Sequence, residues 1–312
     1  MTEHKIYILG IISITTAAAL WGMSGVILVP RLSNLPISFV VFMQYAYPFA
    51  VMSLFFYKEM KNLRKLTKKD LAALIMIALF TGVVGTFAIV KALFLMDFRH
   101  LSVVVLLQKV QPVFAIILAR FLLKEQMSKN FIYWVIFVLI FVYFMSFGLH
   151  IPELTNNNLL LACVFAIVAA MCFGSGTVFG RYLSTNLSFI TITYFRYAFT
   201  SFIMLCYVLL FNDLILNFSS MSDSNWLIFT LILVSSGPLS MFLFYWGLKY
   251  VKASMSAICE LSLPITAIIL DFLVYDNIFS PVQWIGAAGM MYGIFKITRN
   301  QLKLEHINLD ES

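Results

Sequence analysis

Charged residues are scarce in this 312-residue chain, and their scarcity excludes a soluble fold. Asp, Glu, Lys and Arg make up only 11% of the chain, whereas apolar residues make up 62%. A soluble domain carries roughly 25% charged residues. Because no soluble domain of this length could bury so much apolar surface, we predict that a lipid bilayer surrounds the protein.

Cysteine and histidine are also few, at four residues each. The cysteines lie within apolar runs and show no CxxC spacing, so neither a disulfide framework nor a metal site is expected. The histidines lie at the ends of those runs or in loops. The sequence has no Walker loop, Rossmann fingerprint or GxSxG elbow. We therefore expect neither an enzyme nor a resident cofactor, and no ATP hydrolysis by this chain. The cysteines are Cys163, Cys172, Cys206 and Cys259.

Apolar runs of the length that crosses a hydrocarbon core, roughly 20 residues, occur in ten places. They are continuous and do not alternate, which favours helices over strands. The first run looks partly like a secretory signal, but it continues to Val29 and has a copy in the second half, so we interpret it as a retained helix. The ten predicted membrane helices cover residues 6–29, 36–57, 71–96, 101–123, 131–149, 158–180, 187–211, 226–248, 253–275 and 281–298.

The basic residues predict an orientation. With the N-terminus in the cytoplasm, fifteen of the 21 Lys and Arg residues fall at cytoplasmic ends and loops, two fall outside and four lie within spans. This bias is typical of inner-membrane proteins. The formal charge of +7 is thus explained by topology, and we expect no nucleic-acid partner. Both termini are predicted to be cytoplasmic, in what is expected to be a bacterial inner membrane.

One sequence pattern occurs twice, 152 residues apart. Ser102 is followed ten residues later by Pro112 and then by Ala-Ile-Ile-Leu at 115–118, and Ser254 is followed in the same way by Pro264 and the same four residues at 267–270. The chain therefore contains two copies of one unit. We expect the units at 1–150 and 151–299, with a cytoplasmic tail at 300–312.

Each unit contains five predicted helices, and an odd number inverts the second copy relative to the first. The fold class predicted is thus an all-α membrane protein of ten transmembrane helices, arranged as two inverted five-helix repeats. Proteins of this kind place a substrate site at the seam between the copies and alternate access by moving one copy against the other.

Several motifs resemble the EamA-type drug/metabolite transporters. They are the small-residue first helix with Ala18-Ala19-Leu20-Trp21-Gly22, the two Ser-x9-Pro patterns, the Leu-Leu-x-Glu at 122–125, and the glycines of the last helix. The resemblance also covers Arg196 in the seventh helix. It implies a multipass carrier of small organic solutes, often amino acids or other metabolites.

Ionisable side chains within spans are costly and usually face a cavity or a partner. Lys91, Lys109, Arg196 and Glu260 are the deepest. One carboxylate cannot neutralise three cations, so the core has surplus positive charge, which suits a ligand with a carboxylate or phosphate. An internal ion pair that only orders helices is the structural alternative for the lysines. Glu260 is a counter-ion, a proton-coupling site or a partner for a substrate ammonium.

Polar and aromatic residues near the same depth complete the predicted site. Gln44 and Gln108 bind ligand or bridge helices, and Tyr194 and Trp246 supply aromatic surface or simply pack. Pro112 and Pro264 lie within helices and are either static kinks or hinges.

We thus predict a secondary transporter that moves a small charged metabolite, an amino acid or a derivative of one, by alternating access, with coupling to protons or another ion left open. One alternative is a carrier of a larger anionic or nucleoside-like metabolite. The alternative from another class is a membrane assembly protein without transport activity.

Overall fold

The structure is a computed structural model that describes residues 3–96, 104, 107–122, 130–149, 157–211, 218–251, 256, 259–260, 262–276 and 279–310. All regular structure in these residues is helical. This agrees with the bilayer prediction, because a helix satisfies every backbone donor and acceptor within its own segment.

The first half of the chain alternates long helices with short π- and 3₁₀-helical pieces. Its elements are α1 (Glu3–Met23), η1 (Ser24–Leu28), η2 (Val29–Leu32), α2 (Ile37–Phe56), η3 (Tyr57–Lys65), α3 (Lys68–Met76), η4 (Ile77–Gly85), α4 (Thr86–Leu95), η5 (Gln108–Val110), α6 (Gln111–Leu122) and α7 (Phe131–Phe147). The second half contains α8 (Asn157–Asn186), α9 (Phe189–Phe211), α11 (Asp223–Val234), α12 (Pro238–Tyr250), α14 (Ser262–Tyr275) and α15 (Pro281–Asp310).

Six helical segments are long and apolar enough to cross a membrane within the described part of the chain. They correspond to the first, second, third, sixth, seventh and eighth predicted spans. The fifth span appears as a shorter apolar helix, and the fourth and ninth run partly over residues outside the described ranges. The six segments are Lys5–Leu32, Ile37–Arg64, Lys68–Leu95, Asn158–Ser184, Phe189–Phe211 and Asp223–Tyr250.

Two capping boxes fix where helices begin. Thr67 accepts from the backbone N–H of Asp70, whose carboxylate accepts from the Thr67 backbone in return, so α3 starts at Lys68. Ser222 and Asn225 make the same reciprocal pair at the start of α11. Each box satisfies donors that a helix N-terminus otherwise leaves without partners.

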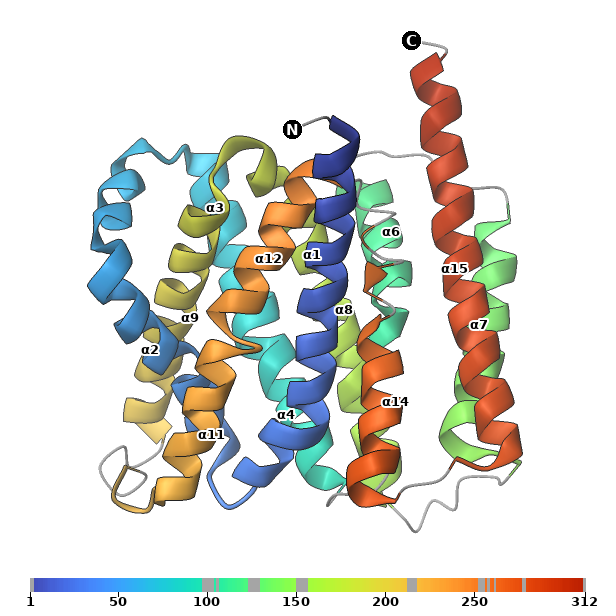
Figure 1. The fold of residues 1–312 in the computed structure, drawn as a ribbon, viewed down its shortest axis with the longest axis horizontal. Coiled ribbons are helices and arrows are strands. Elements are labelled where there is room, and N and C mark those ends of the chain that lie inside the picture. The colour runs from blue at the N-terminus through green and yellow to red at the C-terminus, as the bar shows by residue number, and fades with distance from the viewer. Residues whose placement is uncertain are drawn as a thin grey trace.

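Helices from the two halves interleave throughout the bundle (Figure 1). Helix α1 packs against α12 and α14, while α8 packs against η4, α4 and α6. Helices α2 and α9 pack on each other, and α7 packs on α15 at one side. The two ends of the chain lie at the same end of the bundle.

Large apolar side chains are exposed on the outside of the bundle, and several polar side chains are buried within its apolar interior. Leu54, Phe55 and Leu210 are more than 70% exposed, whereas Thr193, Thr200 and Ser240 are fully buried. An exposed apolar rim of this kind marks a surface that lipid or another apolar partner covers.

Prolines 112 and 264 lie near the starts of two helices, and part of the chain before each proline lies outside the described residues. They are the second and third residues of α6 and α14, and the chain leaves the α-helical path just before each of them, at η5 and near Glu260. Proline is well tolerated in the first turn of a helix, because the missing N–H has no helical partner there. Their hinge role stays a prediction.

Candidate functional site

A cavity of about 200 Å³ lies between the two halves of the chain. Both halves contribute to its wall, which combines aromatic rings with amides, hydroxyls, one guanidinium and one carboxylate. Its aromatic residues are Trp21, Tyr45, Phe173, Tyr197, Phe244 and Tyr245, and its polar residues include Ser24, Gln44, Thr81, Thr86, Gln108, Gln111, Thr177, Arg196, Ser236 and Glu260.

Four of these polar residues come from places where the backbone departs from α-helical geometry. Ser24 lies in the π-helical η1, Thr81 in the π-helical η4 and Gln108 in the 3₁₀-helical η5. Ser236 lies in the turn that separates α11 from α12. Non-helical backbone within a membrane is tolerated only where it is buried in protein or lines a cavity, and π-helical turns are frequent at functional sites.

Equivalent positions of the two copies meet in the cavity. Gln108 and Glu260 are 152 residues apart in the sequence, as are Trp21 and Phe173, and all four residues line the cavity. The repeat therefore places the two copies face to face there, but with different chemistry. One copy contributes an amide where the other contributes a carboxylate.

Arg196 extends from α9 into this wall and is only 6% exposed. Its Nη1 donates to the Tyr245 hydroxyl at 3.1 Å, and Tyr45 lies close enough to interact with it. Within the described residues no carboxylate pairs with this guanidinium, and its Nε has no hydrogen-bond partner. A buried cation held by tyrosines keeps donor capacity for a further group.

Glu260 is 5% exposed and accepts a hydrogen bond from the Ser256 hydroxyl at 3.3 Å. Gln111 also lines the cavity and bridges two helices, because its Nε2 donates to Thr177 Oγ1 at 2.9 Å. The carboxylate and the bridging amide enter the wall from opposite copies.

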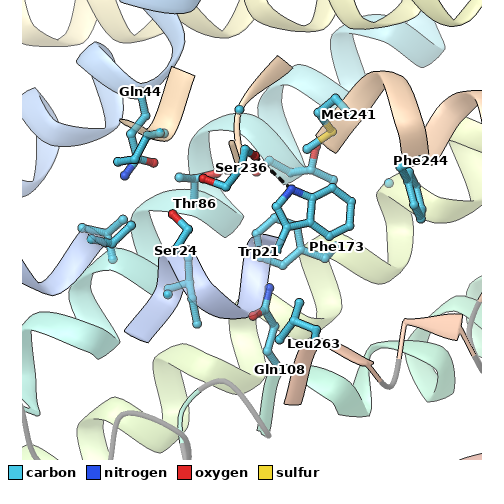
Figure 2. Close-up of a pocket in the computed structure, with 18 of the residues that line it drawn as sticks. Trp21, Ser24, Gln44, Thr86, Gln108, Phe173, Ser236, Met241, Phe244 and Leu263 are labelled. Atoms are coloured by element: carbon cyan, nitrogen blue, oxygen red, sulfur yellow. Dashed lines mark hydrogen bonds between the residues drawn. The ribbon is translucent and has the colours of Figure 1, made fainter. Parts of the chain in front are cut away.

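The aromatic wall is held by its own contacts (Figure 2). The indole N–H of Trp21 donates to the Ser236 carbonyl at 3.1 Å, and the ring meets Phe244 edge-on at 5.2 Å between centroids. Tyr45 donates to or accepts from Thr86 at 2.9 Å between their oxygens. Fixed rings and satisfied hydroxyls give the cavity a defined shape before any ligand enters.

The structure brings together four of the eight site residues predicted from the sequence, namely Gln44, Gln108, Arg196 and Glu260. The other four are placed elsewhere or lie outside what the structure describes. Tyr194 packs between Phe49 and Phe195, and its hydroxyl pairs with Ser53 at 3.2 Å.

Trp246 packs against Tyr250 and is absent from the cavity wall. Lys91 is half-buried on α4 and is also absent from the wall. The side chain of Lys109, in η5, lies outside the described residues. Sequence reasoning missed Tyr245 and Met241, although both lie 152 residues after cavity residues of the first copy, Leu93 and Ile89.

A helical membrane bundle with a polar cavity between two related halves is the architecture of a solute transporter, and comparison with known proteins agrees. The EamA-like transporter family model matches residues 8–147 and again 160–299. The chain therefore belongs to the EamA-like transporter family, and it is a transporter rather than an enzyme.

Two curated relatives cover most of the chain. The riboflavin transporter ImpX of Fusobacterium nucleatum subsp. nucleatum is 43% identical over 295 residues, which is 94% of this chain and 98% of that protein. The uncharacterized transporter YetK of Bacillus subtilis is 25% identical over 287 residues, covering 91% of this chain and 85% of that protein. A solved crystal structure matches with a TM-score of 0.59 at 13% identity, covering 94% of this chain and 96% of the other, and shares the fold.

Proposed function

We propose that this protein transports riboflavin or a closely related flavin across the cell membrane. The observation that carries the proposal is the 43% identity, over nearly the whole of both chains, to a protein named a riboflavin transporter. The amino-acid substrate expected from the sequence finds no support in the comparisons. Riboflavin is uncharged at neutral pH, so the proposed substrate differs from the charged metabolite that the core cations led us to expect.

The cavity suits a flavin in chemical terms. Riboflavin joins a flat tricyclic ring, with carbonyl oxygens along one edge, to a chain of hydroxyl groups. The rings of Trp21, Phe173 and Phe244 offer flat apolar surface for such a tricycle. Gln44 and Gln108 add amides that donate to carbonyls and accept from hydroxyls.

Counterflow in proteoliposomes tests the proposal without assuming a direction of transport. Vesicles loaded with unlabelled riboflavin should accumulate labelled riboflavin transiently, and protein-free vesicles should not. A set of labelled amino acids, nucleosides and flavin mononucleotide serves as the comparison panel. Exchange of another solute with no exchange of riboflavin would overturn the proposal, and exchange of flavin mononucleotide alone would favour the anionic alternative.

We also propose that the two family matches are inverted five-helix repeats, bounded at residues 1–150 and 151–299 and followed by a tail at 300–312. Packing supports this. At Gly22 a side chain would collide with the backbone of Leu263, and at Gly174 it would press on the backbone of Gln111. Both partners of the second pair are 152 residues from their counterparts in the first. The same close contact is thus made twice with the roles of the copies exchanged.

Alternating access is the proposed mechanism, and contacts at the two ends of the bundle support it. At one end, the loop after η2 is tied to α11 by the amides of Asn34 and Asn225. At the other end, Asp70 of α3 lies beside Tyr182 and Asn186 at the end of α8. Each contact joins the end of the first helix of one copy to the start of the third helix of the other. Opening one pair at a time would expose the cavity to one side of the membrane.

For the orientation, we propose that both termini face the cytoplasm of a bacterial inner membrane. The common end of the two termini and the excess of basic residues predicted on that side support this. Alkaline phosphatase fused to either terminus should be inactive, and a cytoplasmic fluorescent reporter should fluoresce. An active phosphatase fusion at either terminus would contradict the orientation.

A further inference from the structure

Two buried donors in the cavity wall have no hydrogen-bond partner within the described part of the chain. They are Nε of Arg196 and Nε2 of Gln44. Both residues line the cavity, and Arg196 is 94% buried. A buried polar group without a partner is destabilising. Such groups persist where a ligand supplies the missing acceptor, and here two of them face one space.

The two donors lie at the same level of one helix interface. Gln44 on α2 and Arg196 on α9 each directly precede a tyrosine, and the rings of Tyr45 and Tyr197 meet at 5.1 Å between centroids. Because α2 and α9 pack together, this ring contact sets the register of the helices at these residues. The amide and the guanidinium therefore enter the cavity from adjacent positions on neighbouring helices.

The guanidinium is also held in place. Its Nη1 donates to the Tyr245 hydroxyl at 3.1 Å, so one nitrogen is occupied while Nε is left with no partner. A carboxylate or phosphate ligand binds best to the paired nitrogens of one guanidinium. Here the unsatisfied donors belong to two different side chains, one charged and one neutral. A ligand with two separate acceptors satisfies both donors, whereas an anion bound to the guanidinium alone leaves the Gln44 amide without a partner.

The rest of the wall also disfavours an anionic ligand. Glu260 lines the same cavity and is 5% exposed, so the described wall carries one carboxylate beside its one guanidinium and has no surplus positive charge. The adjoining surfaces of Trp21 and Phe173 are aromatic. The surroundings therefore fit an uncharged, flat ring whose edge carries acceptors.

We propose that Arg196 and Gln44 together bind the acceptor edge of an uncharged heteroaromatic ligand, such as the pyrimidine-dione edge of a flavin ring. This inference rests on the proposed function for the choice of ring. According to this inference the protein selects its ligand by the edge of the ring. The carbonyl oxygens of the ring therefore matter more for binding than the substituent that the ring carries.

Thermal-shift binding to the purified full-length protein tests the inference with two flat tricyclic probes. Lumiflavin keeps the dione edge and replaces the hydroxyl chain with a methyl group, and phenazine has no carbonyl groups. The wild type should bind lumiflavin at least about tenfold more tightly than phenazine, because the only acceptors of phenazine are its two central ring nitrogens and its outer rings offer none to the two donors. Equal affinities for the two probes would overturn the inference, and this comparison needs no variant that has to fold.

Variants then show which side chains cause the preference for lumiflavin over phenazine. Arg196→Lys keeps the positive charge but lacks Nε, and Gln44→Leu keeps the size but lacks the amide. Each should reduce the lumiflavin-to-phenazine preference several-fold, whereas Tyr194→Phe, a buried change on α9 away from the cavity, should leave it unchanged. Full preference in both variants would rule out the assigned donors.

The binding test and the transport test fail separately. If riboflavin counterflow is absent while lumiflavin binding depends on Arg196 and Gln44, the edge-binding inference holds and the proposed substrate is wrong. If riboflavin is exchanged while lumiflavin and phenazine bind alike, the proposed function holds and the inference is wrong.

Discussion

The side-chain amides of Asn34 and Asn225 bond to each other in both directions, with N···O distances of 3.2 and 3.1 Å. The residues are 191 positions apart and belong to different copies of the repeat. Asn225 is also part of the capping box that starts α11. The pair thus connects the end of one long helix to the first turn of another across the seam.

Removing the Asn34–Asn225 hydrogen bonds should favour opening of the cavity at the end of the bundle where these residues lie. Asn34→Ala deletes both amide bonds and leaves the capping box intact. With a net value of about 1 kcal/mol for each bond, we expect the population open at that end to rise by about fivefold or more. The measurement is the rate at which a membrane-impermeant maleimide labels Ser24→Cys, in a background in which the four native cysteines are replaced by serine.

Asn186→Ala is the matched control, because Asn186 lies beside Asp70 at the opposite end. It should speed labelling from the other side of the membrane and not from the side that Asn34→Ala affects. Equal effects of both variants on both sides would contradict alternating access controlled by these contacts.

The Tyr245 hydroxyl positions the Arg196 guanidinium, so Tyr245→Phe should weaken transport without removing the cation. We expect a loss in kcat/KM of roughly tenfold, since a hydrogen bond to a charged group contributes about 1.5–3 kcal/mol. Tyr194→Phe is the control, because that hydroxyl pairs with Ser53 away from the cavity. Initial rates of riboflavin exchange measure both variants, and similar losses in the two would show that the effect is not specific to Arg196.

Glu260→Gln should abolish any dependence of flux on an imposed pH gradient. The carboxylate lies in the cavity wall and is 5% exposed, and carboxylates at such positions carry protons in many transporters. Ser256→Ala removes the hydroxyl that donates to Glu260 but keeps the carboxylate, so it should retain the dependence. Flux is measured in proteoliposomes with the inside acidic, alkaline or matched. Gradient-dependent flux in Glu260→Gln would exclude this residue as the coupling site.

The two tryptophans Trp21 and Trp246 should differ in importance. Trp21 lines the cavity, whereas Trp246 packs against Tyr250 outside it. Trp21→Leu should weaken riboflavin binding by roughly tenfold, because ring-on-ring contact contributes about 0.5–1.5 kcal/mol beyond the area buried. Trp246→Leu should bind normally. Both affinities are measured by titrating riboflavin with protein and following the quenching of its fluorescence. A larger loss of affinity in Trp246→Leu than in Trp21→Leu would show that the binding site is not this cavity.

Gly22→Val should destabilise the fold. A side chain at this position collides with the carbonyl of Leu263, and backbone of a packed helix moves little. Overpacking of this kind costs about 1–3 kcal/mol. The midpoint of thermal unfolding in detergent should fall by several degrees. The control is Leu9→Ala on α1, which should change the midpoint little because the Leu9 side chain is 41% exposed.

Part of the cavity wall could be predicted from the sequence because ionisable groups rarely occur within spans. Arg196 and Glu260 were predicted on that basis, and both line the cavity. Tyr194 was predicted as aromatic surface at the depth of the charged residues, but it is not among the residues that line the cavity. Helix rotation decided this, and rotation depends on how α2 and α9 pack.

The sequence by itself determined the membrane environment, the helical class and the duplication. Composition, the length of the apolar runs and the repeated pattern can all be read without knowing which residues are in contact. It could not determine which polar groups share a cavity. Ser24, Thr81 and Gln108 line the cavity from the π- and 3₁₀-helical segments η1, η4 and η5, whose positions the apolar pattern of the sequence does not reveal. Only the tertiary structure decided that Arg196 would pair with a tyrosine and leave one donor unsatisfied, because the partners of a side chain are chosen by the packing of helices far apart in the chain.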